Sequence, residues 1–290
     1  MANTSDPIVE EPISNGKSNV ASSSSTGAKS STAPVHKSAI AKLTDLINVS
    51  HVRFAWFVSN VITVWHGFLY LQPLFGGARL NSIWYRISLL GAFATFALVI
   101  YQNLKTYKTA SGKWSVRAFL QDDNVHYLYD SLIWLIFPKH LLALIPFIVF
   151  SLFHVLTFIG NEVLPTLGVA SGLAKKITSF TVQNHELSRR VAASSELLLL
   201  VVLIFKSILF YKWSWISLIA YSIFIKVKSE GSIFTRHVLK DWEVRIDGLV
   251  SNQSVPPVVK TYWGSFKRAL KSADKFSIIK KVEVEAQKKQ

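Results

Sequence analysis

The sequence predicts an all-α, polytopic membrane protein made of helical hairpins, with amphipathic helices on the cytosolic side. Half of the 290 residues are hydrophobic, including nine Trp and nineteen Phe. Charged residues make up 17% of the chain, against about 25% in an average soluble protein, and they lie in blocks between apolar runs. These runs occur in pairs joined by short polar turns, as expected of helices whose backbone groups must be satisfied inside a membrane.

The first 38 residues are predicted to be a disordered tail. Residues 1–38 are rich in Ser and poor in bulky apolar residues, so they cannot bury enough surface to fold. The tail has neither a basic start nor an apolar core, so we expect no cleaved signal peptide. Residues 39–53 show helical spacing of apolar residues, which fits either a helix on the membrane surface or a plain lead-in to the first span.

Residues 39–225 are predicted to be the membrane domain. It contains three hairpins, at 54–104, 127–159 and 196–225. Both arms of the first hairpin are close to the ~20 residues that a helix needs to cross a bilayer, and they flank a turn around residues 73–77.

The second and third hairpins have shorter arms. In the second, the arm 127–137 has about eleven residues and is ended by Pro138, whereas 141–159 is long enough to span. In the third, a turn at 211–214 leaves arms of roughly 14 and 11 residues. These hairpins are therefore predicted to enter the membrane without necessarily reaching the far side.

The basic residues predict the orientation. The long loops 105–126 and 160–195 carry four Lys or Arg each, whereas each short turn carries one, and a surface helix is expected over 178–191. Because Lys and Arg mark the cytoplasmic side, both tails and both long loops are predicted to be cytosolic. Four spans with one or two surface helices would give the same tail orientation. Three glycosylation motifs, at Asn3, Asn48 and Asn252, should then stay unmodified.

Residues 226–290 are predicted to be a basic, amphipathic tail, with 14 Lys or Arg against 7 Asp or Glu. Pro256 and Pro257 separate two helices. The first helix is expected either to touch the membrane or to pack on the membrane domain or a partner. The second has apolar residues on one face and Lys or Arg elsewhere, which is typical of a helix in an anionic membrane interface. Its predicted membrane-binding residues are Tyr262, Trp263, Phe266, Leu270, Lys260, Lys267, Arg268 and Lys271.

The composition also limits the possible partners and chemistry. The net charge of +15 is compatible with nucleic acid, but the basic residues flank membrane segments, so anionic lipids are expected instead. The chain has no Cys, which excludes disulfides and thiolate chemistry. We predict no catalytic residues, no cofactor and no metal site.

Four ionisable residues in or near the apolar arms keep an alternative open, namely a transporter, a channel regulator or a lipid-modifying enzyme. His126 and Asp130 share a helix face and could form an acid–base pair or a structural hydrogen bond. His66 and His154 lie inside apolar arms, where ionisable groups are functional candidates, although both can be neutral and hydrogen-bonded between helices.

Several short groups between residues 117 and 159 carry a family resemblance through their order and spacing. They are Arg117-Ala118-Phe119-Leu120, His126-Tyr127-Leu128, Ser131-Leu132-Ile133, Pro138, Phe150-Ser151-Leu152 and His154. Together they resemble the central segment of the transmembrane protein 33 family, also called Krüppel homologue 2. The similarity continues more weakly through Asn184 and Glu196, and the N-terminal tail shows none.

The resemblance implies a location in the endoplasmic reticulum and nuclear envelope. Fungal members of that family associate with nuclear pore complexes and reticulon-type proteins, and their tails are implicated in binding membranes and an import receptor. By this resemblance Tyr262, Trp263 and Phe266 would insert, and the basic residues of the same helix would hold headgroups. The expected function is non-enzymatic: shaping or sensing membrane curvature, scaffolding partners, and contributing to pore assembly or distribution and tubule organisation.

Overall fold

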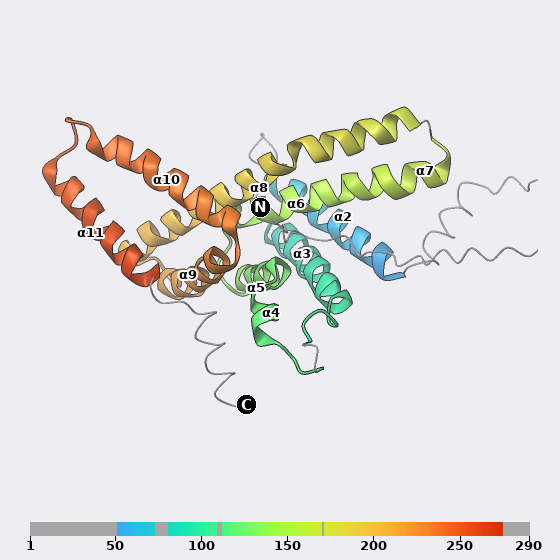
Figure 1. Cartoon of the computed structure of the whole chain (residues 1–290), viewed down its shortest axis with the longest axis horizontal. Coiled ribbons are helices and arrows are strands. Elements are labelled where there is room, and N and C mark those ends of the chain that lie inside the picture. The colour runs from blue at the N-terminus through green and yellow to red at the C-terminus, as the bar shows by residue number, and fades with distance from the viewer. Residues whose placement is uncertain (1–50, 73–80, 109–111, 170, 275–290) are drawn as a thin grey trace, which may run out of the picture.

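The computed structural model describes residues 51–72, 81–108, 112–169 and 171–274 (Figure 1). The regular elements in these ranges are helices, which confirms the predicted all-α fold class. They are α2 (His51–Leu71), α3 (Ser82–Gln102), α4 (Val116–Leu120), α5 (Asp123–Ile136), α6 (Leu141–Phe158), a π-helical turn (Ile159–Val163), α7 (Leu164–Leu167), α8 (Ser171–Ile208), α9 (Ser214–Gly231), α10 (Ile233–Ser251) and α11 (Pro257–Asp274). The predictions for residues 1–38, for residues 39–50 and for the turn at 73–77 concern residues outside these ranges.

Four of the described helices are long and apolar enough to cross a membrane. They are α2, α3, α6 with its extension to Leu167, and α8. Helix α5 has 14 residues, about 21 Å at 1.5 Å per residue, which is shorter than the ~30 Å hydrocarbon core. The chain is therefore a polytopic membrane protein in which a short helix accompanies longer ones.

The first hairpin packs through small and hydroxyl-bearing residues. A Cβ added to Gly91 would lie 2.7 Å from Thr63 Oγ1 and 2.9 Å from the carbonyl oxygen of Ser59, so only glycine fits at this contact. Nearby, the Ser88 hydroxyl donates to the carbonyl oxygen of Thr63 at 2.8 Å. Close approach at small residues and interhelical hydrogen bonds are how helices associate in lipid, where no hydrophobic force acts between them.

The turn between α5 and α6 forms where Pro138 predicts it. Phe137 has an extended backbone, as a residue before proline prefers, and closes α5. Arg86 on α3 donates to the last carbonyl groups of α5, at 2.9 Å from Trp134 O and 3.3 Å from Phe137 O. A cation at the helix C-terminus satisfies acceptors that have no partner within the helix.

One prediction for the membrane domain is wrong. We expected a loop over 160–195, with a separate surface helix at 178–191 and a short arm after 196. Instead α6 continues through the π-helical turn and α7 to Leu167, and α8 runs unbroken from Ser171 to Ile208. No proline occurs between those residues of α8, and α6 lies along its polar first half, so nothing ends the helix (Figure 1).

Candidate functional site: the tail helices and a buried ion pair

Helix α10 packs on the membrane domain, as one of the two alternatives for the first tail helix predicted. Val238 is buried against Ala193 and Leu197 of α8. The helix begins at a serine cap, because the Ser232 hydroxyl accepts the backbone N–H of Thr235 at 3.3 Å. In Figure 1, α10 and α11 form an arm on the left of the molecule that turns back at residues 252–256.

Most of the apolar face of α11 is exposed. The exposed fraction is 74% for Tyr262, 62% for Val258 and 43% for Phe266. Exposed apolar side chains on one face of a helix mark a contact surface for a membrane or a partner. Leu270 belongs to the same helix, but its side chain is outside the described part of the chain.

The basic residues of α11 are mostly exposed as well. Lys260, Arg268 and Lys271 are solvent-exposed along α11. Lys260 makes only a long contact of 3.5 Å to the carbonyl oxygen of Ser251, and Arg268 donates to the Ser265 hydroxyl at 3.1 Å. Their charges are accessible to a negatively charged surface.

Two of the predicted membrane-binding residues are instead held by α10. The indole N–H of Trp263 donates to Asp247 Oδ1 at 2.5 Å, and Lys267 Nζ lies 2.7 and 2.8 Å from the two Asp247 oxygens. Lys267 also lies 3.8 Å from Glu243. The hydrogen bonds from Lys267 and Trp263 lower the pKa of Asp247, and the bond to Asp247 raises the pKa of Lys267. We call this contact the α10–α11 latch.

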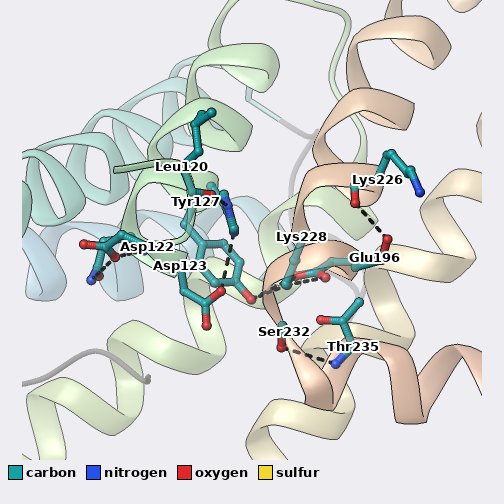
Figure 2. Close-up of polar contacts among 12 residues, drawn as sticks. Leu120, Asp122, Asp123, Tyr127, Glu196, Lys226, Lys228, Ser232 and Thr235 are labelled. Carbon is teal, nitrogen blue, oxygen red and sulfur yellow. Dashed lines mark hydrogen bonds and ion pairs between the residues drawn. The ribbon is translucent and has the colours of Figure 1, made fainter. Parts of the chain in front are cut away.

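A second lysine–carboxylate pair lies inside the protein where α5, α8 and α9 meet (Figure 2). Lys228 Nζ lies 2.7 and 2.6 Å from the two Glu196 oxygens, and it also donates to the Tyr127 hydroxyl at 2.5 Å. Tyr127 in turn donates to Glu196 at 3.1 Å. The side chains of Lys228 and Glu196 are 5% and 1% exposed, so this is a buried, fully hydrogen-bonded ion pair.

Aromatic rings surround the buried pair. Lys228 Nζ lies 4.3 Å from the ring centroid of Tyr127 and 5.4 Å from that of Phe224, which are cation–π distances. The Tyr221 hydroxyl donates to the backbone carbonyl of Glu196 at 3.2 Å. Because Lys228 is four residues before Ser232, the pair fixes the end of α9 from which the tail helices start.

Sequence reasoning missed this pair. The sequence pattern places Glu196 at the first position of the third predicted hairpin and Lys228 in the predicted basic tail. A usable signal existed, since Glu196 precedes Tyr211 by 15 residues and Lys228 follows Ser214 by 14. Two residues at matching distances from a turn face each other in a hairpin, so opposite charges there indicate a pair.

The predicted His126–Asp130 pair is wrong. His126 Nε2 bonds the carbonyl oxygen of Leu120 at 2.7 Å and its ring faces Asp123 at 3.4 Å, whereas Asp130 accepts the indole N–H of Trp134 at 2.8 Å. Asp122 caps α5 and its neighbour Asp123 lies in the first turn, so the His126 ring turns toward the start of the helix.

The two histidines in apolar arms also differ from expectation. His66 Nδ1 contacts the carbonyl oxygen of Ile62 in its own helix at 2.9 Å, not a neighbouring helix. The His154 ring packs 5.1 Å from the Trp56 ring, and its Nε2 has no hydrogen-bond partner. The four candidate residues thus have separate environments, and the described residues contain no group of three His, Asp or Glu that could hold a metal.

These features define the class: a polytopic α-helical membrane protein with a basic amphipathic tail, anchored by a buried ion pair. The family model for transmembrane protein 33/nucleoporin POM33 matches residues 35–272. The chain belongs to this family, which confirms the resemblance found in residues 117–159.

Curated fungal relatives match over most of their length. The chain is 32% identical over 235 residues to the pore membrane protein of 33 kDa of Saccharomyces cerevisiae, covering 76% of this chain and 82% of that protein. It is 28% identical to nucleoporin POM33 of Chaetomium thermophilum, covering 76% and 85% of the two chains. It is also 28% identical to tetra-spanning protein 1 of Schizosaccharomyces pombe, covering 76% and 83%. No solved structure matches the chain.

Proposed function

We propose that this protein is a non-enzymatic scaffold of the endoplasmic reticulum and nuclear envelope that senses or shapes curved membrane and contributes to the assembly or distribution of nuclear pore complexes. The observation that carries the proposal is the exposed apolar face of α11, bordered by Lys260, Arg268 and Lys271. The fungal relatives named as a pore membrane protein and a nucleoporin support the link to the pore.

The tail helix acts at the cytosolic membrane surface. Tyr262 and Phe266 enter the headgroup region, while the neighbouring basic residues attract anionic lipids, at roughly 1 kcal/mol for each. Trp263 and Lys267 join them when the latch opens, because an anionic headgroup offers Lys267 the same charge that Asp247 offers it. Both tails are cytosolic in this proposal: four candidate spans are an even number, and the basic residues of 105–126 and of the polar half of α8 support the cytosol as their side.

Membrane curvature follows from unequal occupation of the two leaflets. Helix α5 is too short to cross, so it adds area to the leaflet from which it enters, beside the longer helix α6. An amphipathic helix lying in the same leaflet adds to this difference. Partners of the reticulon type, nucleoporins and an import receptor are compatible with such a scaffold.

Live imaging of a C-terminally tagged copy beside a pore marker and a tubule marker tests the proposal. Puncta that coincide with pores, and that are lost when residues 256–283 are deleted, are the expected result. A continuous reticular signal that is indifferent to the deletion would contradict the pore role.

The alternative class, a transporter or lipid enzyme, is tested by a quadruple substitution. Alanine at His66, His126, Asp130 and His154 removes the ionisable groups that such an activity would use. A scaffold keeps its location and its effect on pore distribution in the quadruple variant. Loss of function in a variant that still inserts and folds would favour the alternative.

A further inference from the structure

The segment between α3 and α5 is folded onto both helices in its described residues. The Tyr107 side chain is 2% exposed and packs with Ile100 of α3 and Val125 of α5. Its hydroxyl group donates to the carboxylate of Asp122, the residue that caps α5. The backbone N–H of Ser115 donates to the carbonyl oxygen of Tyr107 at 2.7 Å, which draws the two sides of the segment together. The segment therefore presents a fixed outer surface.

A cluster of three aromatic rings supports that surface. The Trp114 ring centroid lies 5.6 Å from that of Tyr107 and 5.7 Å from that of Phe119. The rings of Tyr107 and Phe119 meet edge to face at 5.4 Å. Although Trp114 packs in this cluster, it is 48% exposed, and Val116 in the first turn of α4 is 44% exposed. Trp is enriched where a membrane meets water, so an indole ring held in this way suits that interface.

The same segment is positively charged. Residues 103–122 contain four Lys or Arg and a single Asp. All four cations are exposed, and they are Lys105, Lys108, Lys113 and Arg117. The acid, Asp122, accepts the Tyr107 hydroxyl group and the backbone N–H of Asn124, the latter at 2.7 Å. The outer surface of the segment therefore combines a net positive charge with exposed apolar side chains.

The end of α3 places this surface at the level of the lipid headgroups. Helix α3 is a candidate span that ends at Gln102, and the segment follows it directly. Tyr101 and Leu104, on either side of that end, are 64% and 38% exposed. Figure 1 shows α4 apart from α10 and α11, so the surface is separate from the tail helices. A nucleic acid or an acidic protein would match the charge alone, whereas exposed apolar side chains at the end of a span match a bilayer surface.

We propose that the segment between α3 and α5 is a second membrane-binding site, specific for anionic phospholipid. Trp114 and Val116 enter the headgroup region, while Lys105 and Lys108 bind the phosphate groups of the lipids. The site is folded before it meets lipid, so it loses little conformational freedom on binding. It goes beyond the proposed function, in which α11 makes the contact with the membrane surface, because the two surfaces belong to different elements.

An environment-sensitive dye on the full chain in nanodiscs tests the proposal. Because the chain has no Cys, Val116→Cys gives a unique site for the dye. We expect a blue shift of the emission that grows as phosphatidylserine replaces phosphatidylcholine and declines as salt screens the attraction. The shift should persist in a full chain with Glu at Lys267, Arg268 and Lys271, which separates this site from the tail helix.

Removing two cations from the site should weaken the response. The double variant Lys105→Gln, Lys108→Gln should reduce the blue shift about twofold or more, since each cation strengthens the attraction about fivefold. The matched control, Lys175→Gln with Lys176→Gln, makes the same charge change at exposed positions of α8 and should leave the shift unchanged. Thermal unfolding checks that both variants fold. A dye signal that is indifferent to lipid composition, equal loss in the control, or loss in the tail variant would overturn the proposal.

Discussion

Two lysine–carboxylate pairs in this protein have almost the same geometry and opposite surroundings. Lys228 approaches Glu196 to 2.6 Å and Lys267 approaches Asp247 to 2.7 Å. The first pair is 5% and 1% exposed, whereas the second is 27% and 41% exposed. A contact distance therefore says little about what an ion pair does, and the environment decides it.

The buried pair is permanent and the exposed pair is exchangeable. Separating Lys228 from Glu196 leaves a charge inside the protein without the opposite charge that compensates it, which is expensive. Separating Lys267 from Asp247 exposes both to water or to a headgroup, which is inexpensive. The first suits an anchor for the tail and the second suits a latch that a membrane can open.

Breaking the buried pair should have the largest effect. Replacing Glu196 with Gln, or Lys228 with Met, leaves one partner uncompensated and should lower the free energy of unfolding by about 3–5 kcal/mol. Chemical or thermal unfolding of the full chain in detergent measures it. The control is Lys226→Met, whose pair with Glu230 on the same helix is longer, at 3.3 Å, and more exposed, at 22% and 11%, so it should cost less than the buried pair.

The double variant Glu196→Met, Lys228→Met sharpens that test. It removes both charges, so it should recover much of the stability lost in either single variant. Equal losses in the Lys226 control and in the Lys228 variant would show that the buried pair is not an anchor.

Reversing the charge of the tail helix should have the next largest effect. With Glu at Lys267, Arg268 and Lys271, binding of a peptide of residues 256–283 to anionic liposomes should fall by on the order of 100-fold, since each cation contributes roughly 1 kcal/mol. Raising the salt concentration should weaken binding of the unmodified peptide, because the attraction is screened. Binding that responds to neither change would refute the interfacial role of α11.

Opening the latch should strengthen membrane binding by a smaller factor. Asp247→Asn removes the competitor for Lys267 and should raise association of the tail with anionic membranes about two- to fivefold, as expected for an exposed pair. The association can be measured with a label on the tail of the full chain in nanodiscs. It can also be measured by the binding of a fragment of residues 233–274 to liposomes. Asp241→Asn makes the same charge change at an exposed position of α10 and should have no such effect.

The pH dependence of the latch should be the smallest effect. Because the pKa of Asp247 is lowered in the folded state, its contribution is complete above the unfolded value of about 3.9 and is lost as pH falls through the folded value. The indole N–H signal of Trp263, followed by NMR without lipid, should stay constant from pH 7 to pH 5 and change only in stronger acid. If the Trp263 signal moved away from its latched chemical shift near pH 6, a group other than Asp247 would control the latch.

Local patterns in the sequence predicted where helices form better than they predicted which residues of different helices are in contact. Pro138 correctly predicted the end of α5, and the spacing around Pro256 and Pro257 correctly predicted two tail helices. The continuity of α8 was missed because basic residues at 175–176 and 189–190 suggested a loop, although they lie on the polar half of one long helix. The partner of Asp247 depends on how α10 and α11 pack, which no local pattern encodes. The partner of Glu196 is indicated only when positions are counted outward from the turn of the third hairpin.

The most direct test follows the apolar face of α11 in the whole protein. The chain has no Cys, so Tyr262→Cys provides a unique site for an environment-sensitive dye, and Thr261→Cys, one position along on the opposite, polar side, provides the control. In nanodiscs we expect a blue-shifted emission at position 262 with anionic lipid, a smaller shift with neutral lipid or high salt, and little change at position 261. Identical spectra at the two positions in every lipid would contradict a tail helix that lies in the membrane surface.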